Sequence, residues 1–292
     1  MLTQQLFNGL LLGATFSLVA LGFNLVVGAL DRLNFALGEA SMVSAVVGAV
    51  IANNTHLPFA VTFLAAVAVG GTLAVAVYFT SFKYVKSEFP TASILSSLGV
   101  GLVLTALVTK IFGSNQRGVP DVLPNVRLHL GIVEISGAQL VILGLSIVMT
   151  AGLYVFLERT VWGTAIRGVS DDATMTGLLG VPVQRVILLT FALSGMLAGA
   201  AGLLTGLSDH TVSPFDGFAT TLSGLIIIVI GGLGSVTGGV IAAIAVGMIE
   251  TLSIAYLSAT LRDLVVYILV GFVLLVRPQG LLGRNAGVLE RV

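Results

Sequence analysis

Long apolar runs separated by short polar segments recur along the whole chain and constrain its fold more than any motif does. A helix that crosses the hydrocarbon core of a bilayer needs about 20 apolar residues. Only 9% of the residues are charged, against about 25% in soluble domains. The sequence therefore predicts an all-α polytopic membrane protein with about eight to nine transmembrane helices, short loops and some broken or re-entrant helices. The expected spans are 7–30, 34–52, 58–82, 91–113, 138–158, 185–207, 217–233, 236–257 and 261–277.

Composition also limits the partners and the chemistry open to the chain. The net charge is zero and no basic stripe is present, which argues against binding to nucleic acid. The chain has no cysteine, so disulfides and thiolate metal sites are excluded. The histidines fall in separate predicted loops and no P-loop motif occurs, so we expect neither a metal site nor an ATP site. Residues 1–292 should form a single transmembrane domain, because no loop is long enough for a soluble one.

The one long polar segment in the second half of the chain runs from Glu158 to Arg185. Ser170 is predicted to cap a short helix there, because a serine hydroxyl can accept a bond from the free N–H groups of the first turn. Asp171 and Asp172 would lie in that turn, where carboxylates favour the positive end of the helix dipole. The segment is thus expected to hold one capped helix between two spans.

That helix is predicted to be amphipathic. Met175, Leu178 and Leu179 follow one another at i, i+3 and i+4 and would form one apolar stripe. Gly180 and Pro182 should end the helix. An apolar stripe outside the membrane needs a partner surface, so the segment predicts a docking site.

Lysine and arginine residues in short loops predict which side of the membrane each loop faces. If the 158–185 segment is cytoplasmic, nine of the 13 Lys and Arg residues share its side. This orientation predicts a cytoplasmic C-terminus and, with nine crossings, an external N-terminus; one crossing fewer would reverse the N-terminus. The largest external loop is then Ser114–Gly137. The residues on the cytoplasmic side are Arg32, Lys83, Lys86, Arg159, Arg167, Arg185, Arg277, Arg284 and Arg291.

An ionisable residue stands at the start of the second expected span. Glu39 is either a functional group within the membrane or a partner of Arg32 at the cytoplasmic interface. Asn34 should cap the helix that follows, and Gly38 allows a kink or a close approach. A broken helix here would line a cavity, because irregular backbone at membrane depth must face protein or water.

Further features of the chain also predict polar contacts or close packing. Glu250 lies deep in the expected 236–257 span, where it could line a polar pathway or pair with a neighbouring span. Glycines four residues apart in 194–206 favour close helix packing, within the chain or at a subunit interface. A polar outer face is expected, either solvated or receiving a partner protein or a solute, from Asp209, His210, Asp216 and Arg262.

Several stretches together resemble one family. The family's signature segment is similar to LGFNLVVGALDRLNFALGEASM. Its cytoplasmic loop and following span resemble GTAIRGVSDDATMTGLLGVPVQRVILLTFALSGMLAGAAGLL, and its C-terminal third resembles GGLGSVTGGVIAAIAVGMIE and LLVRPQGLLGR. These are the LivH-type permeases, the membrane subunits of branched-chain amino acid ABC importers. The resemblance covers nearly the whole chain, is weakest at 114–137, and implies one permease domain over 1–292.

The resemblance implies a role for the polar segment and for the start of the second span. Residues 159–184 would be a cytoplasmic coupling loop whose helix docks on an ATPase subunit. The family's usual Glu-Ala-Ala-like triplet is replaced by Thr174-Met175-Thr176, which leaves open the side chains that make the contact. Candidate docking residues are Gly163, Arg167, Asp171, Asp172, Met175, Leu178 and Gly180. Candidate residues of the translocation pathway are Asn34, Phe35, Gly38, Glu39 and Glu250.

The same resemblance implies an assembly around the chain. It would pair with a second, LivM-like permease in a heterodimer, with two cytoplasmic ATPase subunits that bind ATP and Mg, and with an external solute-binding protein. The complex would lie in the inner membrane of a bacterial or archaeal cell. The chain itself would be no enzyme and would carry no cofactor, and it would pass branched-chain or other hydrophobic amino acids.

Other functions stay open at this stage. A permease of the same family could carry urea, amides or aromatic acids. A self-sufficient secondary transporter or channel would need ion-coupling groups within the membrane, and only Glu39 and Glu250 qualify. A purely structural membrane subunit is disfavoured by the capped docking loop.

Overall fold

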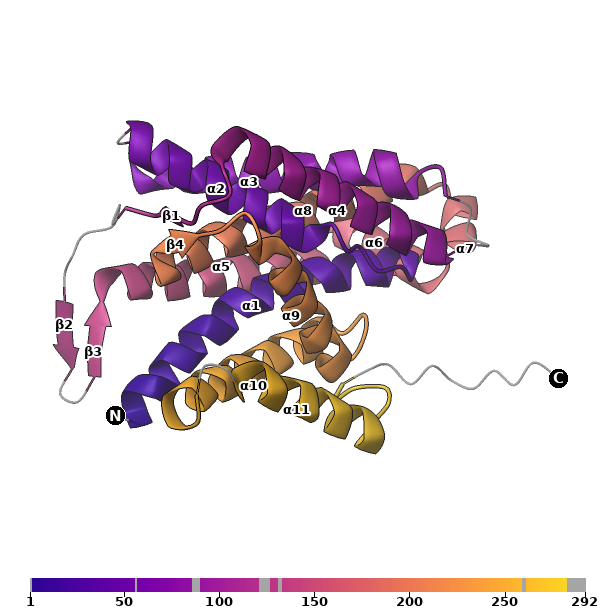
Figure 1. Cartoon of the computed structure of the whole chain (residues 1–292). Coiled ribbons are helices and arrows are strands. Elements are labelled where there is room, and N and C mark those ends of the chain that lie inside the picture. Colours follow the sequence, from indigo (N-terminus) through magenta and orange to yellow (C-terminus); the bar gives the residue numbers. More distant parts are fainter. Residues whose placement is uncertain are drawn as a thin grey trace.

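The computed structural model describes residues 2–55, 57–85, 90–120, 127–130, 133–258 and 261–282 (Figure 1). Helices make up most of the described chain, which confirms the predicted all-α fold. Predictions for Lys86, Arg284 and Arg291, and for part of the 114–137 loop, lie outside these residues.

The elements follow one another as long helices with a short helical pair in the middle. In chain order the helices are α1 (Leu2–Leu30), α2 (Leu37–Thr55), α3 (Phe59–Val77) with its π-helical continuation η1 (Tyr78–Phe82), α4 (Pro90–Phe112), α5 (Gly137–Arg159), α6 (Val161–Asp171), α7 (Ala173–Leu178), α8 (Val183–Asp209), α9 (Asp216–Gly231), α10 (Val236–Tyr256) and α11 (Arg262–Val276). The short strands are β1 (Arg117–Gly118), β2 (Arg127–Leu130), β3 (Val133–Ser136) and β4 (Thr211–Val212).

Length and composition agree with a membrane-spanning bundle. Six helices of the described chain are long and apolar enough to cross a bilayer: α1, α3 with η1, α4, α5, α8 and α10. Three further helices run between the same two ends without meeting both the length and the hydropathy of a spanning helix: α2 with 19 residues, α9 with 16 and α11 with 15. The described chain therefore passes between the two ends of the bundle nine times, in agreement with the sequence prediction.

Helix α1 forms the centre of the bundle. It has 29 residues, about 43 Å at 1.5 Å per residue, and Leu18, Leu21 and Phe23 are completely buried. Glycine allows its backbone to touch α10, because a Cβ added at Gly13 would lie 2.6 Å from the Cα of Ile244. The apolar core of the protein is thus arranged around its first helix.

The glycines of 194–206 pack within the chain rather than at an outside surface. A Cβ added at Gly195 would lie 2.2 Å from the carbonyl oxygen of Gly70 in α3. One added at Gly202 would lie 2.2 Å from the carbonyl oxygen of Ser41 in α2. Only a hydrogen fits at either position, so α8 is held close to α2 and α3.

The two ends of the bundle are distinct (Figure 1). We call one the hairpin end, because it carries the antiparallel β2–β3 hairpin and the pairing of β1 with β4; the sequence prediction did not include these strands. The N-terminal residues lie there, with Gln4 donating a hydrogen bond to the carbonyl oxygen of Glu134 (3.0 Å). We call the other the loop end, because it carries α6 and α7. The N-terminal residues and the 158–185 segment therefore lie at opposite ends, as the five helices between them, α1 to α5, require.

At the loop end, the chain turns are tied to each other. Asn24 of α1 donates to the carbonyl oxygen of Ser235 (3.0 Å) and accepts from the backbone N–H of Gly234 (3.1 Å), which fixes the α9–α10 turn. Leu281 donates to the carbonyl oxygen of Ile230 (2.7 Å). The end of the described chain thus shares the loop end with α6 and α7.

Candidate functional site

The backbone between α1 and α2 is irregular and buried. Asn34 is only 1% exposed, and its side-chain oxygen accepts a hydrogen bond from the backbone N–H of Ala36 (3.1 Å). This contact leads the chain into α2, which begins at Leu37, three residues later than the predicted span. Asn34 therefore forms the turn that precedes α2, and the prediction that its side chain caps the first N–H groups of the helix is wrong.

The backbone polar groups of Phe35 are hydrogen-bonded to side chains inside the bundle. Its N–H donates to the hydroxyl oxygen of Ser97 in α4 (3.1 Å). Its carbonyl oxygen lies 3.3 Å from the hydroxyl of Thr221 in α9, which it shares with the carbonyl oxygen of Gly217 (3.0 Å). Unpaired backbone groups at membrane depth would cost several kcal/mol each. Two side chains from two different helices thus replace the bonds that a helix would have supplied.

Glu39 lies where α2, α4 and α9 meet. Its side chain is buried, with the residue 7% exposed, and accepts a hydrogen bond from the hydroxyl of Thr105 (2.8 Å). Arg32 donates instead to the carbonyl oxygen of Val85 and to the hydroxyl of Ser93. The structure therefore joins Glu39 to α4, and places it away from the interface pairing with Arg32 that the sequence left open.

Glycines make room for the carboxyl group. A Cβ added at Gly217 of α9 would lie 2.1 Å from a carboxyl oxygen of Glu39. A Cβ added at Gly38 would lie 2.3 Å from the carbonyl oxygen of Gly217 and from the hydroxyl oxygen of Thr221. The close approach of α2 and α9 thus depends on these two glycines.

Glu250 belongs to a different place, nearer the hairpin end. It is 5% exposed, and its carboxylate lies 3.9 Å from the Nε of Arg262 at the start of α11. Both residues line a cavity of about 360 Å³, here called the outer cavity, together with Asp209 and Asp216. Part of its wall is apolar and includes Phe16, Met42 and Ile254. The residues predicted for a pathway therefore fall into two groups, one at the start of α2 and one around Glu250.

The polar segment folds as two helices, so the prediction of one helix capped by Ser170 is wrong. Ser170 lies inside α6, where its hydroxyl donates to the carbonyl oxygen of Ile166 (3.0 Å). Asp171 ends α6. Asp172 caps α7 instead, accepting bonds from the backbone N–H groups of Thr174 (2.8 Å) and Met175 (2.9 Å).

Helix α6 is pressed against the end of α5. A Cβ added at Gly163 would lie 2.3 Å from the carbonyl oxygen of Leu157. Arg167 forms an ion pair with Glu158 of α5 (2.8 Å). These contacts hold the start of α6 against the end of α5.

The predicted apolar stripe is present and uncovered. Met175, Leu178 and Leu179 are 61%, 78% and 84% exposed, whereas Thr176 on the other face is buried against Gly168 of α6. Gly180 has a positive φ of 86° and follows the last turn, as predicted for a glycine that ends a helix. The stripe is thus an apolar surface at the loop end of the bundle.

Sequence reasoning missed the hydroxyl partners of the α2 start, namely Ser97, Thr105 and Thr221. Each is a hydroxyl residue in an otherwise apolar span, and this was the only feature of the sequence that could have indicated a polar contact there. Among the described residues, no group of three or more His, Cys, Asp or Glu side chains could hold a metal ion.

The chain resembles known proteins over nearly its full length. The family described as "Branched-chain amino acid transport system / permease component" matches residues 5–276. The high-affinity branched-chain amino acid transport system permease protein LivH of Salmonella typhimurium is 31% identical over 96% of this chain and 95% of its own length. The corresponding protein BraD of Pseudomonas aeruginosa is 28% identical over 96% and 95%.

A solved structure shares the fold at much lower sequence identity. PsaBC from Streptococcus pneumoniae in complex with Fab superposes with a TM-score of 0.54 and 13% identity, over 93% of this chain and 91% of that chain. This likeness concerns the fold alone. The family match and the LivH identity extend over the buried α2 start and the α6–α7 segment alike. The chain therefore belongs to the family of branched-chain amino acid transport system permeases.

Proposed function

We propose that this chain is the membrane subunit of an importer that moves branched-chain amino acids and is driven by ATP hydrolysis on separate subunits. The observation that carries the proposal is the exposed stripe of Met175, Leu178 and Leu179 on α7. Apolar side chains exposed together outside the spans mark an interaction surface. An ATPase subunit that covers the stripe would receive a rigid contact, because α7 is capped by Asp172 and packed on α6.

The α6–α7 segment acts as the coupling element. Gly163 and Arg167 join it to α5, while Asp171, Asp172 and Gly180 define where its helices begin and end. Motion of the ATPase subunits would therefore pass directly to the membrane helices, because no flexible loop lies between α5 and α6 to absorb it. ATP and Mg belong to those partners, and the permease contributes no covalent chemistry of its own.

The pathway for the solute runs past the start of α2 and the outer cavity. Asn34, Phe35, Gly38 and Glu39 form the first part, where three helices meet around irregular backbone. Glu250 belongs to the second. The outer cavity suits an aliphatic α-amino acid, since it offers the guanidinium of Arg262, several carboxylates and an apolar wall. A carrier of urea or amides would have less use for charges of both signs.

The coupling element and the solute pathway each require further subunits. A second, LivM-like permease completes the membrane part, two ATPase subunits bind at the loop end, and a solute-binding protein docks at the hairpin end. The loop end then faces the cytoplasm, together with the C-terminus, and the complex lies in the inner membrane. The sequence pattern supports this orientation, because it predicts nine of the 13 Lys and Arg residues on the same side of the membrane as the 158–185 segment.

The docking role is tested by Leu178→Arg and Asp172→Arg in the assembled transporter. Both should prevent the ATPase subunits from co-purifying with the permease, or should separate ATP hydrolysis from uptake. Leu57→Arg is the control for ATPase co-purification, because Leu57 is also an exposed leucine but stands between α2 and α3 at the hairpin end. Normal co-purification and uptake in both loop-end variants would refute the proposal.

A second experiment separates this function from that of a self-sufficient transporter or channel. The chain is reconstituted alone in liposomes and tested for amino acid flux under ion gradients. We expect no flux until the ATPase subunits, the second permease and the binding protein are present. Sustained flux by the chain alone would exclude the ABC importer mechanism.

A further inference from the structure

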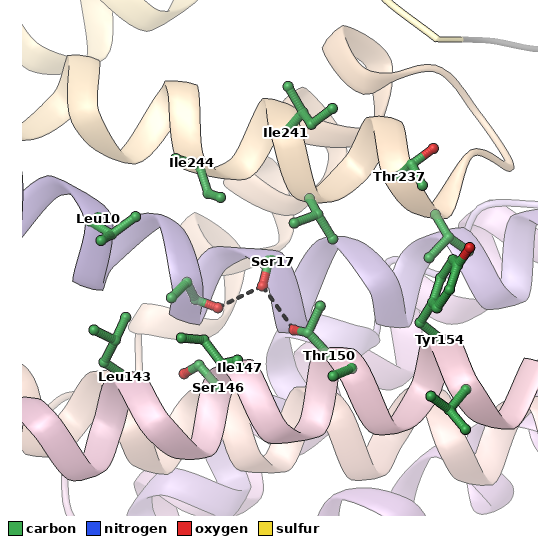
Figure 2. Close-up of a pocket in the computed structure, with 15 residues that line it drawn as sticks. Leu10, Ser17, Leu143, Ser146, Ile147, Thr150, Tyr154, Thr237, Ile241 and Ile244 are labelled. Atoms are coloured by element: carbon green, nitrogen blue, oxygen red, sulfur yellow. Dashed lines mark hydrogen bonds between the residues drawn. The ribbon is translucent and has the colours of Figure 1, made fainter.

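An apolar groove runs between α1, α5 and α10 (Figure 2). It has a volume of about 570 Å³, and we call it the membrane groove. Ser17 and Thr150 lie 3.2 Å apart on its wall, and Ser17 also donates to the carbonyl oxygen of Ala14 (2.7 Å). The hydroxyl of Ser146, which also lines the groove, is buried without a hydrogen-bond partner among the described residues. The surface that the groove presents is therefore mainly hydrocarbon. Its other labelled walls include Leu10, Leu143, Ile147, Ile241 and Ile244.

The groove has the depth of one lipid leaflet. Along α5 its lining runs from Leu143 to Val155, about 18 Å at 1.5 Å per residue. The hydrocarbon core of one leaflet is about 15 Å deep, half of the bilayer value. On α5 (Gly137–Arg159) this lining begins six residues after the hairpin-end start and ends four residues before the loop-end terminus, so the groove has the length of one acyl chain and reaches close to the loop end.

A charged cavity continues the groove at that end. It has a volume of about 550 Å³ and shares Tyr154, Val236 and Thr237 with the membrane groove. We call it the inner cavity. Its charged side chains are Asp31, Glu158 and Arg167. Apolar surface therefore gives way to charges of both signs where the span of α5 ends.

The charges of the inner cavity select one kind of headgroup. The guanidinium of Arg167 holds Glu158 through one nitrogen (2.8 Å), and its other N–H groups can donate to a phosphate. The carboxylates of Asp31 and Glu158 can accept bonds from a primary ammonium group. An anionic headgroup without an amine would face two carboxylates, and a trimethylated amine has no N–H to donate.

We propose that the membrane groove and the inner cavity together hold one phospholipid with a zwitterionic, primary-amine headgroup. Its acyl chain lies between α1, α5 and α10, its phosphate on Arg167, and its ammonium between Asp31 and Glu158. A helix of a partner protein would fit the membrane groove but would leave the charges of the inner cavity without a counterpart. A phospholipid fits both, because its acyl chain is followed by a charged headgroup. The site is separate from the solute pathway, and it touches the coupling element through Arg167.

The test uses the purified full-length chain, washed of lipid in mild detergent and offered phosphatidylethanolamine, phosphatidylcholine and phosphatidylglycerol at equal concentration. Native mass spectrometry measures the retained copies. We expect one copy of phosphatidylethanolamine, retained roughly tenfold over the other two lipids, as one lost ion-paired contact would produce. Equal retention of the three lipids would overturn the proposal.

Variants locate the site. Ile147→Trp fills the groove and should abolish this retention, whereas Ile147→Ala leaves it open and should keep it. Ile268→Trp in α11 is the matched control, because Ile147 and Ile268 are 56% and 63% exposed and Ile268 lines neither cavity. Glu158→Gln should reduce the preference for the primary amine. Unchanged lipid retention in Ile147→Trp would contradict the assignment. Loss of a co-purifying second permease subunit from this variant, with lipid retention unchanged, would contradict it too.

Discussion

The hydroxyl of Thr105 in α4 donates a 2.8 Å hydrogen bond to the buried carboxyl group of Glu39 in α2. The two residues are 66 positions apart in the sequence, and their contact joins the start of α2 to a helix with many exposed apolar side chains. Glu39 thus holds α4 in place by a polar bond within an apolar bundle.

Replacing Thr105 with valine keeps the shape of the side chain and removes the donor. The carboxyl group of Glu39 then loses this partner, at a cost of about 1–3 kcal/mol for a buried polar group. We expect a lower thermal unfolding temperature of the purified protein and reduced uptake by the assembled transporter. Thr109→Val is the control, because its hydroxyl bonds only to a carbonyl oxygen of its own helix. Equal effects of the two substitutions would argue against a special role for the Glu39 contact.

Gly38→Ala should force α2 away from α9. The added methyl group would meet the backbone of Gly217 and Thr221 at 2.3–2.6 Å, and overpacking of this kind costs about 1–3 kcal/mol. Gly99→Ala in α4 meets nothing within 4 Å and should be neutral or slightly stabilising. Chemical or thermal denaturation of both variants in detergent, with uptake measured alongside, gives the comparison. A stable and active Gly38→Ala protein would mean that the α2–α9 contact is not tight in the membrane.

Asp172→Ala should weaken α7. This helix has only six residues, too few to persist without caps and packing, and loss of an aspartate cap costs about 1 kcal/mol. We expect fewer ATPase subunits to co-purify with this variant, because the apolar stripe is no longer presented as one surface. Asp172→Asn retains an oxygen that can cap and should restore most of the binding. If the asparagine variant behaved like the alanine variant, the carboxylate charge, and not the cap, would be the property that matters.

The sequence predicted the spans because their physics is local. A run of about 20 apolar residues has few alternatives to a transmembrane helix, and glycines four residues apart signal close packing wherever they occur. Gly195 and Gly202 confirm this, since each touches the backbone of a neighbouring helix. The α7 stripe was predictable for the same reason, because spacing alone sets which residues share a helix face.

The remaining details depend on contacts between distant parts of the chain. Ser170 and Asp172 are both good caps, and the sequence does not choose between them. Burial of Ile166 and Val169 against the bundle extends α6 to Asp171 and leaves Asp172 to begin the next helix. In the same way, hydroxyl groups in apolar spans usually bond to their own helix, so Thr105 and Thr221 gave no sign of their partners.

Phe35 carries a consequence for motion. Its N–H is held by Ser97 of α4 and its carbonyl oxygen by Thr221 of α9, and a hydrogen bond is effectively lost beyond about 3.5 Å. If α4 and α9 moved apart by more than a fraction of an ångström, one of these backbone groups would be left unpaired in a setting without water. Any widening between α4 and α9 at this level would therefore break at least one of these two bonds, and the free energy of that loss has to be supplied by whatever drives the widening.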